Sequence, residues 1–449
     1  MKDLLLKQNT HWQKADIAAG NRRDILGKIL QYLDVRHVIA IAGARRSGKS
    51  YLFRQIIDHL TQGSASPQNI LQINFEDPFF VQRRESPDVI EECFLEYMKL
   101  KNPRGRIYLF LDEIQNISSW QFWVRDIYDR NETIKIFITG SNSELLSNEL
   151  ATHLTGRVIA FENFPYSYSE YLRGTGDTNC SIAATASNAD TIYQSNYNNR
   201  NEIIHYIEAA FTGGLFPETC YLGDIERTDF MLRQYFQNVL FSDIIPRFSV
   251  RNTKTIEELA YYCSTNITSP FSYHKLAEAV GSNENTVREY MTYFEKAYLF
   301  FEVSYFEYSL KKQFRRNRKI YMIDNGLRHA SSFSFSDDRG RYAENAVFLM
   351  LRRRYAEIFY WQEDRTLKEV DFIIRDQGRI VAINVTYDDI IHDREYEGLL
   401  AFSKASRAER YIIISRDTFD TRRVGDITIE IIPFWVCIFV DFHEQEQNA

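Results

Sequence analysis

Apolar residues follow two different periods along the first third of the chain. Runs of mostly aliphatic and aromatic residues predict buried strands at 37–42, 72–77, 106–111, 134–139 and 158–161. Elsewhere apolar residues recur every three or four positions, as at 51–60 and 120–128, and predict amphipathic helices. Apolar strands that alternate with such helices are typical of a parallel sheet with helices on both faces. We therefore expect an α/β domain at residues 1–172, with a helical lead-in before the first strand.

The pattern changes after residue 172. Residues 173–201 are rich in Thr, Ser, Ala and Asn, which predicts an exposed low-complexity insertion or linker. Helical patterns resume at 202–255. Residues 256–325 hold a short helix, a glycine turn, a second helix and an alternating strand, which indicate a winged helix-turn-helix region. In the last segment, 326–449, a helix is followed by several strands, and we expect a second α/β domain there.

Composition and charge limit the classes of protein that fit. A chain of 449 residues with 44% hydrophobic residues can form two to four domains with real cores. Its net charge of −7 means that any nucleic-acid contact must come from a local basic patch. The five cysteines show no metal-ligand spacing, and no apolar run is long enough for a membrane span or a signal peptide. We expect a cytoplasmic protein with reduced thiols and no membrane association.

The loop after the first strand carries the strongest chemical signal. It matches the pattern G-x-x-x-x-G-K-[ST] without a gap. Its two glycines permit a tight loop with inward N–H groups, and the N-terminus of the following helix adds partial positive charge. We expect Lys49 to reach the β- and γ-phosphates of a nucleoside triphosphate and Ser50 to hold Mg²⁺. The expected nucleotide-binding residues are Gly43, Ala44, Arg45, Arg46, Ser47, Gly48, Lys49, Ser50 and Tyr51.

An acidic pair follows the strand predicted at 106–111. Asp112 and Glu113 stand at the carboxyl end of this strand, where open α/β sheets bind their ligands. We expect Asp112 to hold Mg²⁺. Glu113 is expected to orient and deprotonate the attacking water, because that role needs a carboxylate just beyond the metal. Two solvated acids at the end of a strand are the alternative, which the preceding loop motif disfavours.

Polar residues also follow the strand predicted at 134–139. In P-loop ATPases such a residue lies beside the γ-phosphate, and Ser141 and Asn142 are the two candidates. A serine-rich turn or helix cap is the alternative. Arg157 stands just before the next strand and is a candidate for stabilising transition-state charge, either in its own chain or across a subunit boundary. A plain surface arginine is equally compatible with the sequence.

The sequence leaves open whether the C-terminal half contacts DNA or a protein. The second helix of the helix-turn-helix pattern carries Glu284, Arg288 and Glu289, so it is slightly acidic and gains little from phosphates. A basic run follows it. This run fits either the wing of a DNA-binding module or a solvated hairpin. Its six cations in nine positions are Lys311, Lys312, Arg315, Arg316, Arg318 and Lys319.

The last segment resembles the scaffold of restriction-endonuclease-like folds. A helix at 344–351 precedes strands at 369–374 and 379–386. In active members the second strand ends in Glu-x-Lys, where the glutamate holds a metal and the lysine activates water. Here Asn384 and Thr386 stand at those positions. An amide is a poor ligand for a hard metal ion and threonine supplies no cation, so we expect no nuclease activity.

With these motifs the chain resembles the large family of bacterial and archaeal AAA-type ATPases that carry a C-terminal nuclease-like domain of unknown function. The resemblance implies ATP and Mg²⁺ as ligands, residues 213–217 near the adenine, and a winged helix before the nuclease-like module. The Asn384–Thr386 triplet departs from many relatives. The matching stretches, in family order, are 43–50, 109–115, 139–143, 154–157, 164–171, 213–217, 320–327, 344–345 and 369–372.

Three classes of function remain compatible with the sequence. The favoured class is a Mg²⁺-dependent ATPase or molecular switch that acts on DNA or a protein partner, as a monomer or an oligomer. An ATP-regulated nuclease is the alternative, which Asn384 and Thr386 oppose. A small-molecule kinase is disfavoured because Asp112 and Glu113 supply a water-activating base and no lid-like arginine cluster follows. A GTPase would need an Asn-Lys-x-Asp guanine reader, which the chain lacks.

Overall fold

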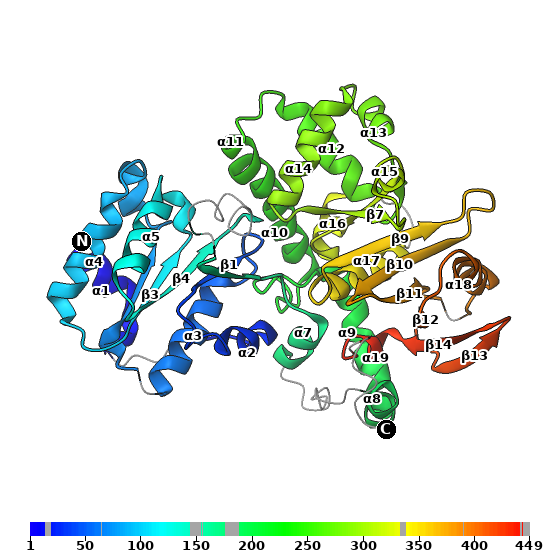
Figure 1. Ribbon diagram of the computed structural model, residues 1–449, viewed down its shortest axis with the longest axis horizontal. Helices are drawn as coiled ribbons and strands as arrows, with labels where there is room; N and C mark the ends of the chain where they lie inside the picture. The colour runs from blue at the N-terminus through cyan, green and yellow to red at the C-terminus, as the bar shows by residue number, and fades with distance from the viewer. Residues whose placement is uncertain are drawn as a thin grey trace. The chain divides into compact units, whose positions relative to one another are not determined.

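The computed structural model (Figure 1) describes residues 1–13, 19–63, 65–143, 154, 156–175, 188–332, 338–388, 390–440 and 442. The chain divides into two compact units. The first comprises Met1–Pro165 with Lys296–Tyr298, and the second comprises Tyr166–Glu295 with Leu299–Ala449. The main segment of the first unit ends at Pro165, and the domain boundary expected at residue 172 stays a prediction.

The first unit is built on a five-stranded parallel sheet, which confirms the expected α/β fold. The strand order is β2-β3-β4-β1-β5. The strands are β1 (Val38–Ala42), β2 (Ile70–Asn74), β3 (Ile107–Asp112), β4 (Ile134–Gly140) and β5 (Val158–Glu162). The helices are α1 (Lys2–Gln8), α2 (Asp24–Leu30), α3 (Lys49–Gln62), α4 (Asp88–Lys101) and α5 (Trp120–Arg130), and short 3₁₀ turns include η4 (Ile114–Asn116).

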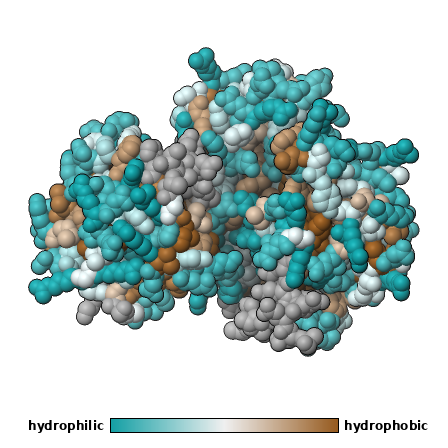
Figure 2. Space-filling view, in the orientation of Figure 1, coloured by the Kyte–Doolittle hydropathy of each residue, from teal (hydrophilic) through white to brown (hydrophobic). Residues whose placement is uncertain are grey.

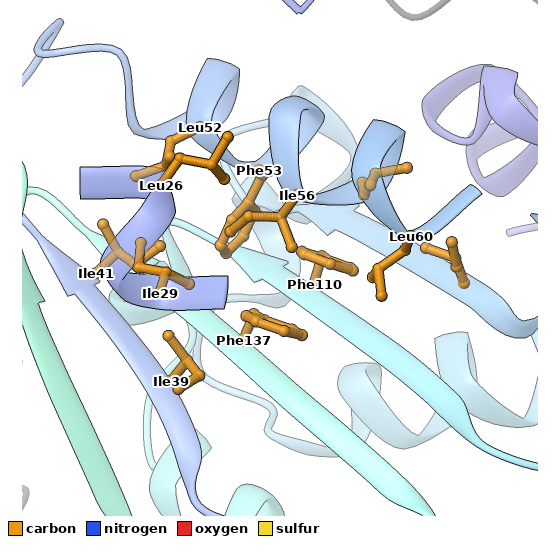
Figure 3. Packing of buried hydrophobic residues seen from close by; sticks show 12 residues of the cluster. Leu26, Ile29, Ile39, Ile41, Leu52, Phe53, Ile56, Leu60, Phe110 and Phe137 are labelled. Atoms are coloured by element: carbon orange, nitrogen blue, oxygen red, sulfur yellow. The ribbon is translucent and has the colours of Figure 1, made fainter. Parts of the chain in front are cut away.

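One apolar cluster fixes α3 on this sheet. Figure 3 shows side chains of α3 that point toward phenylalanines of the neighbouring strands. Phe53 meets Phe110 edge-on at 5.0 Å between ring centroids, and Phe110 stacks on Phe137 at 4.5 Å. Burying each such side chain stabilises the fold by about 1.5–3 kcal/mol. Because α3 begins at the glycine-rich loop, this packing also fixes the loop.

Helices make up the first part of the second unit. They are α7 (Tyr168–Gly174), α8 (Ala189–Asn196), α9 (Arg200–Gly213), α10 (Ile225–Asn238), a π-helical segment (Val239–Ile244), α11 (Ile245–Arg247), α12 (Thr253–Thr265), α13 (Tyr273–Ala279) and α14 (Glu284–Lys296). Part of the expected insertion is therefore helical. In α8, Tyr193 stacks on Phe419 and Trp435, a packing that polar composition did not reveal. Residues 176–187 lie outside the described part of the chain.

The rest of the second unit forms around a mixed nine-stranded sheet of order β13-β14-β12-β11-β10-β9-β7-β8-β6. Its strands are β6 (Pro270–Phe271), β7 (Phe300–Tyr305), β8 (Arg318–Met322), β9 (Glu357–Gln362), β10 (Glu369–Asp376), β11 (Arg379–Val385), β12 (Arg410–Ser415), β13 (Asp420–Val424) and β14 (Ile427–Pro433). The remaining helices are α15 (Leu310–Gln313), α16 (Asn325–Ser331), α17 (Arg339–Arg352), α18 (Asp393–Ala405) and α19 (Phe434–Cys437).

This sheet crosses the domain boundary expected at residue 325. β7 pairs in parallel with β9, so the strands expected in a wing belong to the same sheet as the C-terminal strands. The two expected regions therefore share one sheet. The α13–α14 helix pair is present, whereas its description as a winged helix remains a prediction.

The motif at 213–217 packs against the start of α16 within the second unit. The backbone nitrogen of Leu215 donates to Asp324 Oδ2 at 2.7 Å. A Cβ on Gly326 would lie 2.6 Å from the Cα of Gly214, so glycine is required for this close approach. Two stretches that carry the family resemblance thus contact each other, and the expected adenine contact remains a prediction.

Hydrophilic residues cover most of the face shown in Figure 2. Within the described ranges, no helix has the length and apolar character needed to cross a bilayer.

Candidate nucleotide-binding site

The glycine-rich loop forms between β1 and α3, as the sequence predicts. Gly48 has a φ of 91°, a conformation that strains residues with a side chain. A Cβ on Gly43 would lie 2.0 Å from the backbone oxygen of Asn163, so only glycine fits there. The loop leads directly into α3, whose first N–H groups have no partners within the helix and carry partial positive charge. This end of α3 suits an anion.

Lys49 is the buried cation of the loop. Its Nζ lies 3.2 Å from the backbone oxygens of Gly43 and Ala44 and 3.1 Å from Glu113 Oε1. An ammonium has three donors, so these contacts account for all of them. All three partners lie at the loop or beside it. An anion bound against the loop would compete for the same ammonium.

The expected metal ligands lie together at the same edge of the sheet. Ser50 Oγ donates to Asp112 Oδ2 at 2.7 Å, and Thr139 Oγ1 donates to the other carboxylate oxygen. Burial and the neighbouring Glu113 raise the pKa of Asp112 to about 6, although the bonds from Thr139 and Ser50 oppose this shift. A buried carboxylate beside a hydroxyl gains stability from a divalent cation, because both are oxygen ligands.

Glu113 adopts an unusual backbone conformation just after β3. Its φ is 52°, which is strained for a residue with a side chain and common at functional sites. Its Oε1 contacts Lys49, and its Oε2 accepts a hydrogen bond of 2.5 Å from Gln115 Nε2. Burial alone would raise the pKa of Glu113, but Lys49 and Gln115 lower it on balance. The carboxylate is therefore ionised and able to accept a proton.

Ser141 and Asn142 follow β4 and are buried, with 8% and 3% exposure. Ala42 pairs with Gly140, and the nitrogen of Gly43 donates to the oxygen of Gly140 at 3.3 Å. The two candidates therefore lie next to the glycine-rich loop. Ser141 Oγ also accepts a hydrogen bond from Gln115 Nε2 at 3.3 Å, which links it to Glu113.

The other loop residues serve different purposes. Arg45 pairs with Glu76 at 3.1 Å, and Arg46 adopts a left-handed φ of 64°. Tyr51 is 46% exposed at the start of α3, and the guanidinium of Arg54 lies 4.6 Å from its ring centroid. Tyr51 is thus a partly exposed side chain rather than a core one.

The position of Arg157 corrects one expectation. It directly precedes β5, whose Val158 pairs with Val38 at the start of β1. The glycine-rich loop follows the other end of β1, so Arg157 lies at the opposite edge of the sheet. Its Nε donates to Asp129 at 3.1 Å. Arg157 therefore does not serve the site of its own chain, and a role across a subunit boundary stays a prediction.

Sequence reasoning missed three residues that hold the site in shape. Asn163 Nδ2 donates to the backbone oxygen and to the Oγ of Ser47, both at 3.0 Å. Arg23 Nη1 donates to the same backbone oxygen at 2.7 Å. Gln115 binds Glu113 and Ser141. Only Gln115 had a local signal, because it lies two positions after the expected base.

The described residues fit ATP and Mg²⁺. Three features meet at one edge of the sheet. They are Lys49, whose contacts an anion can replace, the N-terminus of α3, and the buried pair of Asp112 and Ser50. Gln115 Oε1 adds a buried acceptor without a hydrogen-bond partner in the described part of the chain. This donor and acceptor set suits a triphosphate with a hard metal ion.

The structure separates the basic run of the second unit into two halves. Arg316, Arg318 and Lys319 are engaged in ion pairs with Asp364, Glu302 and a carboxylate cluster, respectively. Lys311, Lys312 and Arg315 are exposed and have no ion-pair partner among the residues described. Lys311 and Lys312 lie in the short helix α15, and Arg315 follows it, next to Phe314, whose exposure is 68%.

A lysine of β8 lies among carboxylates of the segment that was expected to be nuclease-like. Lys319 is 1% exposed and contacts Glu344, Glu369 and Asp371. The side-chain amide of Asn384 bonds to backbone groups. Its Oδ1 accepts from the nitrogen of Asp371, and its Nδ2 donates to the oxygen of Glu395. Within the described ranges, no group of three or more His, Cys, Asp or Glu side chains is arranged to hold a metal ion.

Comparisons with known proteins match three successive regions of the chain. Residues 35–172 match an AAA domain, residues 204–338 match a domain of unknown function, DUF8612, and residues 339–436 match another, DUF4143. Uncharacterized protein MJ1544 of Methanocaldococcus jannaschii is 31% identical over 411 residues, which are 88% of this chain and 86% of that protein.

An uncharacterized protein of Haemophilus influenzae is 28% identical over 423 residues, or 93% of this chain and 98% of that protein. Among solved structures, the Walker-type ATPase PABY2304 of Pyrococcus abyssi aligns with a TM-score of 0.42 and 14% identity. The alignment covers 70% of this chain and 98% of that one.

Proposed function

Because the chain belongs to the family in which an AAA-type P-loop ATPase domain precedes DUF8612 and DUF4143, we propose that it is a Mg²⁺-dependent ATPase whose nucleotide state controls a C-terminal binding module. The observation that supports hydrolysis, beyond nucleotide binding, is the Lys49–Glu113 contact of 3.1 Å. This contact supports the proposal because a buried, ionised carboxylate lies beside the lysine that we expect to bind the phosphates.

Each residue of the site has a separate role in this proposal. The loop amides and Lys49 bind the β- and γ-phosphates, while Ser50 and Asp112 hold Mg²⁺. Bound Mg²⁺ supplies positive charge that neutralises the phosphate oxygens. Glu113 orients the attacking water and takes its proton, and Ser141 and Asn142 detect the γ-phosphate.

Replacement of Glu113 tests the proposal. Glu113→Gln keeps the shape of the side chain but cannot accept a proton, so it should retain ATP binding and lose hydrolysis. Equilibrium binding of a fluorescent ATP analogue and phosphate release measure the two effects. Glu132→Gln is the matched control, because Glu132 is a surface residue with 81% side-chain exposure. Normal hydrolysis by Glu113→Gln would show that the assigned base is wrong.

For the C-terminal module we propose contact with nucleic acid at the segment around α15. Three exposed cations without ion-pair partners among the described residues, Lys311, Lys312 and Arg315, support this because they remain free to pair with phosphates. The exposed ring of Phe314 offers a surface on which a base can stack. The expected result is DNA-stimulated ATP turnover that weakens as salt rises.

Charge reversal separates this contact from general electrostatics. Lys311→Glu combined with Lys312→Glu should abolish the stimulation. Lys28→Glu combined with Lys99→Glu changes the net charge equally on exposed residues of the first unit and should preserve it. Stimulation that is unchanged in the first variant, or absent in the wild type, would favour a protein partner.

We propose that the nuclease-like domain binds without cutting. Asn384 holds backbone groups of its own domain, and Lys319 pairs with the carboxylates that a metal ion would need. Plasmid incubated with the protein and Mg²⁺ or Mn²⁺ should remain supercoiled. Nicking that disappears in Asp371→Asn would restore the nuclease alternative.

A further inference from the structure

Gln115 lies between the expected base and the residues that follow β4. Its Nε2 donates to Glu113 Oε2 at 2.5 Å and to Ser141 Oγ at 3.3 Å. It belongs to η4, the tight turn that directly follows Glu113. In this turn the Asn116 side chain donates to the backbone oxygen of Glu113 at 3.1 Å, and Ile114 is fully buried. The turn therefore holds Gln115 against Glu113.

The chemistry of the pair fixes the orientation of the amide. An ionised carboxylate only accepts hydrogen bonds, so Gln115 must present its NH₂ group to Glu113. Its carbonyl oxygen is then left buried, without a hydrogen-bond partner in the described part of the chain. An unpaired buried acceptor costs about 1–3 kcal/mol. Most buried side-chain polar atoms have a hydrogen-bond partner, and an unpaired amide oxygen next to the expected base is in keeping with a role at the site.

The contacts of Lys49 show what that role is. All three donors of its ammonium are occupied, and one of them holds Glu113 Oε1. A triphosphate on the loop takes donors from Lys49, which loosens its hold on Glu113. Gln115 is then the remaining side chain described here that donates to the Glu113 carboxylate.

We propose that Gln115 is a positioning residue that keeps Glu113 oriented after Lys49 has turned to the phosphates, and that couples this orientation to Ser141. The inference rests on the proposed ATPase function. Gln115 does not contact the nucleotide in this mechanism. It affects the chemical step through Glu113 and leaves ATP binding to the loop. Loss of an orienting contact behind a reacting group typically costs about ten- to hundredfold in activity.

Two substitutions at Gln115 separate orientation from packing. Gln115→Ala removes the donor, so kcat should fall about ten- to hundredfold while the Kd for ATP changes less than about twofold. Gln115→Glu keeps the volume but replaces the donor by a like charge, and kcat should fall at least as far. Gln62→Ala is the matched control, because Gln62 is an exposed glutamine whose side chain, among the described residues, donates to Asp58 on the surface of α3. It should behave like the wild type.

Two further readouts exclude a structural role. The thermal midpoint of Gln115→Ala should change little, because the loss of the bonds to Glu113 and Ser141 is offset by removal of the unpaired acceptor. Ser141→Ala should lower kcat, and the Gln115→Ala/Ser141→Ala double variant should lose less than the product of the two single losses. If the loss of kcat in the double variant equalled the product of the two single losses, Gln115 and Ser141 would act independently, and the proposed coupling would be wrong.

The same assays distinguish the two proposals. Wild-type kcat in Gln115→Ala, or a lower kcat that comes with a lower thermal midpoint and is restored in Gln115→Glu, overturns the role of Gln115. If Glu113→Gln abolishes turnover in the same experiment, the ATPase proposal still stands. If Glu113→Gln turns over ATP normally, or the wild type does not turn over ATP, both proposals fall.

Discussion

In the described part of each unit a buried lysine is paired with at least one carboxylate, and the two sites differ in what else surrounds the ammonium. Lys49 is bound to one carboxylate and two loop carbonyls, next to a helix N-terminus. Lys319 is bound to three carboxylates and lies 5.7 Å from the ring centroid of Tyr360. At the first site, a bound ligand can replace the groups that contact the ammonium. At the second site, the three carboxylates already pair with the ammonium and leave it no donor for a ligand.

The comparison shows that a lysine near acids does not by itself make a ligand site. At Lys49, the glycine-rich loop contributes backbone N–H groups and the end of β3 contributes the carboxylate of Glu113, both at one edge of a sheet. At Lys319, burial raises the pKa of Glu344 to about 8, although Lys319 opposes the shift. Burial also raises the pKa of Glu369. Such a site is a closed ion cluster, in which removing one partner leaves uncompensated charge.

Removal of Lys319 should produce the largest effect. Lys319→Met leaves Glu344, Glu369 and Asp371 without their cation, and loss of one partner of a buried ion pair costs about 3–5 kcal/mol. Chemical denaturation measures the free energy of unfolding. Lys311→Met, at an exposed lysine, is the control and should change it by less than about 0.5 kcal/mol. Adding Glu344→Gln should recover part of the loss. A small effect of Lys319→Met would mean that the cluster does not depend on its cation.

The matching change at Lys49 should act on binding. Lys49→Met should weaken ATP binding at least about a hundredfold, or about 2.7 kcal/mol, because the phosphates lose their cation. Its free energy of unfolding should fall less than that of Lys319→Met, since only one carboxylate loses a partner. Calorimetric titration with ATP and denaturation test both halves, with Lys28→Met as the surface control. If Lys49→Met and Lys319→Met lowered the free energy of unfolding equally, the two lysines would not differ in their contribution to stability.

Stability should depend on pH through the closed cluster. The raised pKa of Glu344, about 8, means that the folded state holds a proton that the unfolded chain has lost. Its contribution is therefore full below the ordinary pKa of a glutamate and is lost as the pH rises to about 8. The free energy of unfolding should fall by about 1 kcal/mol per unit between pH 6 and pH 8.

A neutral side chain at this position should flatten that dependence. Glu344→Gln removes the titrating group, whereas Glu357→Gln removes an exposed glutamate whose pKa Arg375 lowers. Denaturation curves at several pH values compare the two variants. Equal slopes in the wild type and in Glu344→Gln would place the titration elsewhere.

An exposed ion pair of the same unit should show the smallest effect. Arg316 forms a two-point contact with Asp364, which is 64% exposed in its side chain. Asp364→Asn should cost less than about 1 kcal/mol, and the cost should shrink as salt is added. Denaturation at low and high salt measures it. If Asp364→Asn cost as much free energy of unfolding as Lys319→Met, burial would not explain the difference in stability between the exposed and the buried ion pairs.

Short-range patterns predicted most of the first unit. The strand, loop and helix around residues 43–50 lie next to one another in the sequence, and the apolar spacing of α3 points to its buried face. The acidic pair after β3 follows from the same logic, because parallel strands place their carboxyl ends at one edge. Arg157 shows the limit of this reasoning. A residue just before a strand lies at the other edge, and the pairing of β5 with β1 decides that.

The sequence by itself determined that the chain has a P-loop and an acidic pair, because each depends on neighbouring residues and on periods of two or 3.6. Tertiary structure alone decided that Asn163 supports Ser47 from 116 positions away, and that Gln115 reaches both Glu113 and Ser141. It also decided that Lys319, the last cation of a basic run, is buried while Lys311 is not. The sequence gives the charge of a residue directly. Its burial and its partners depend on strand register, which brings together residues far apart along the chain.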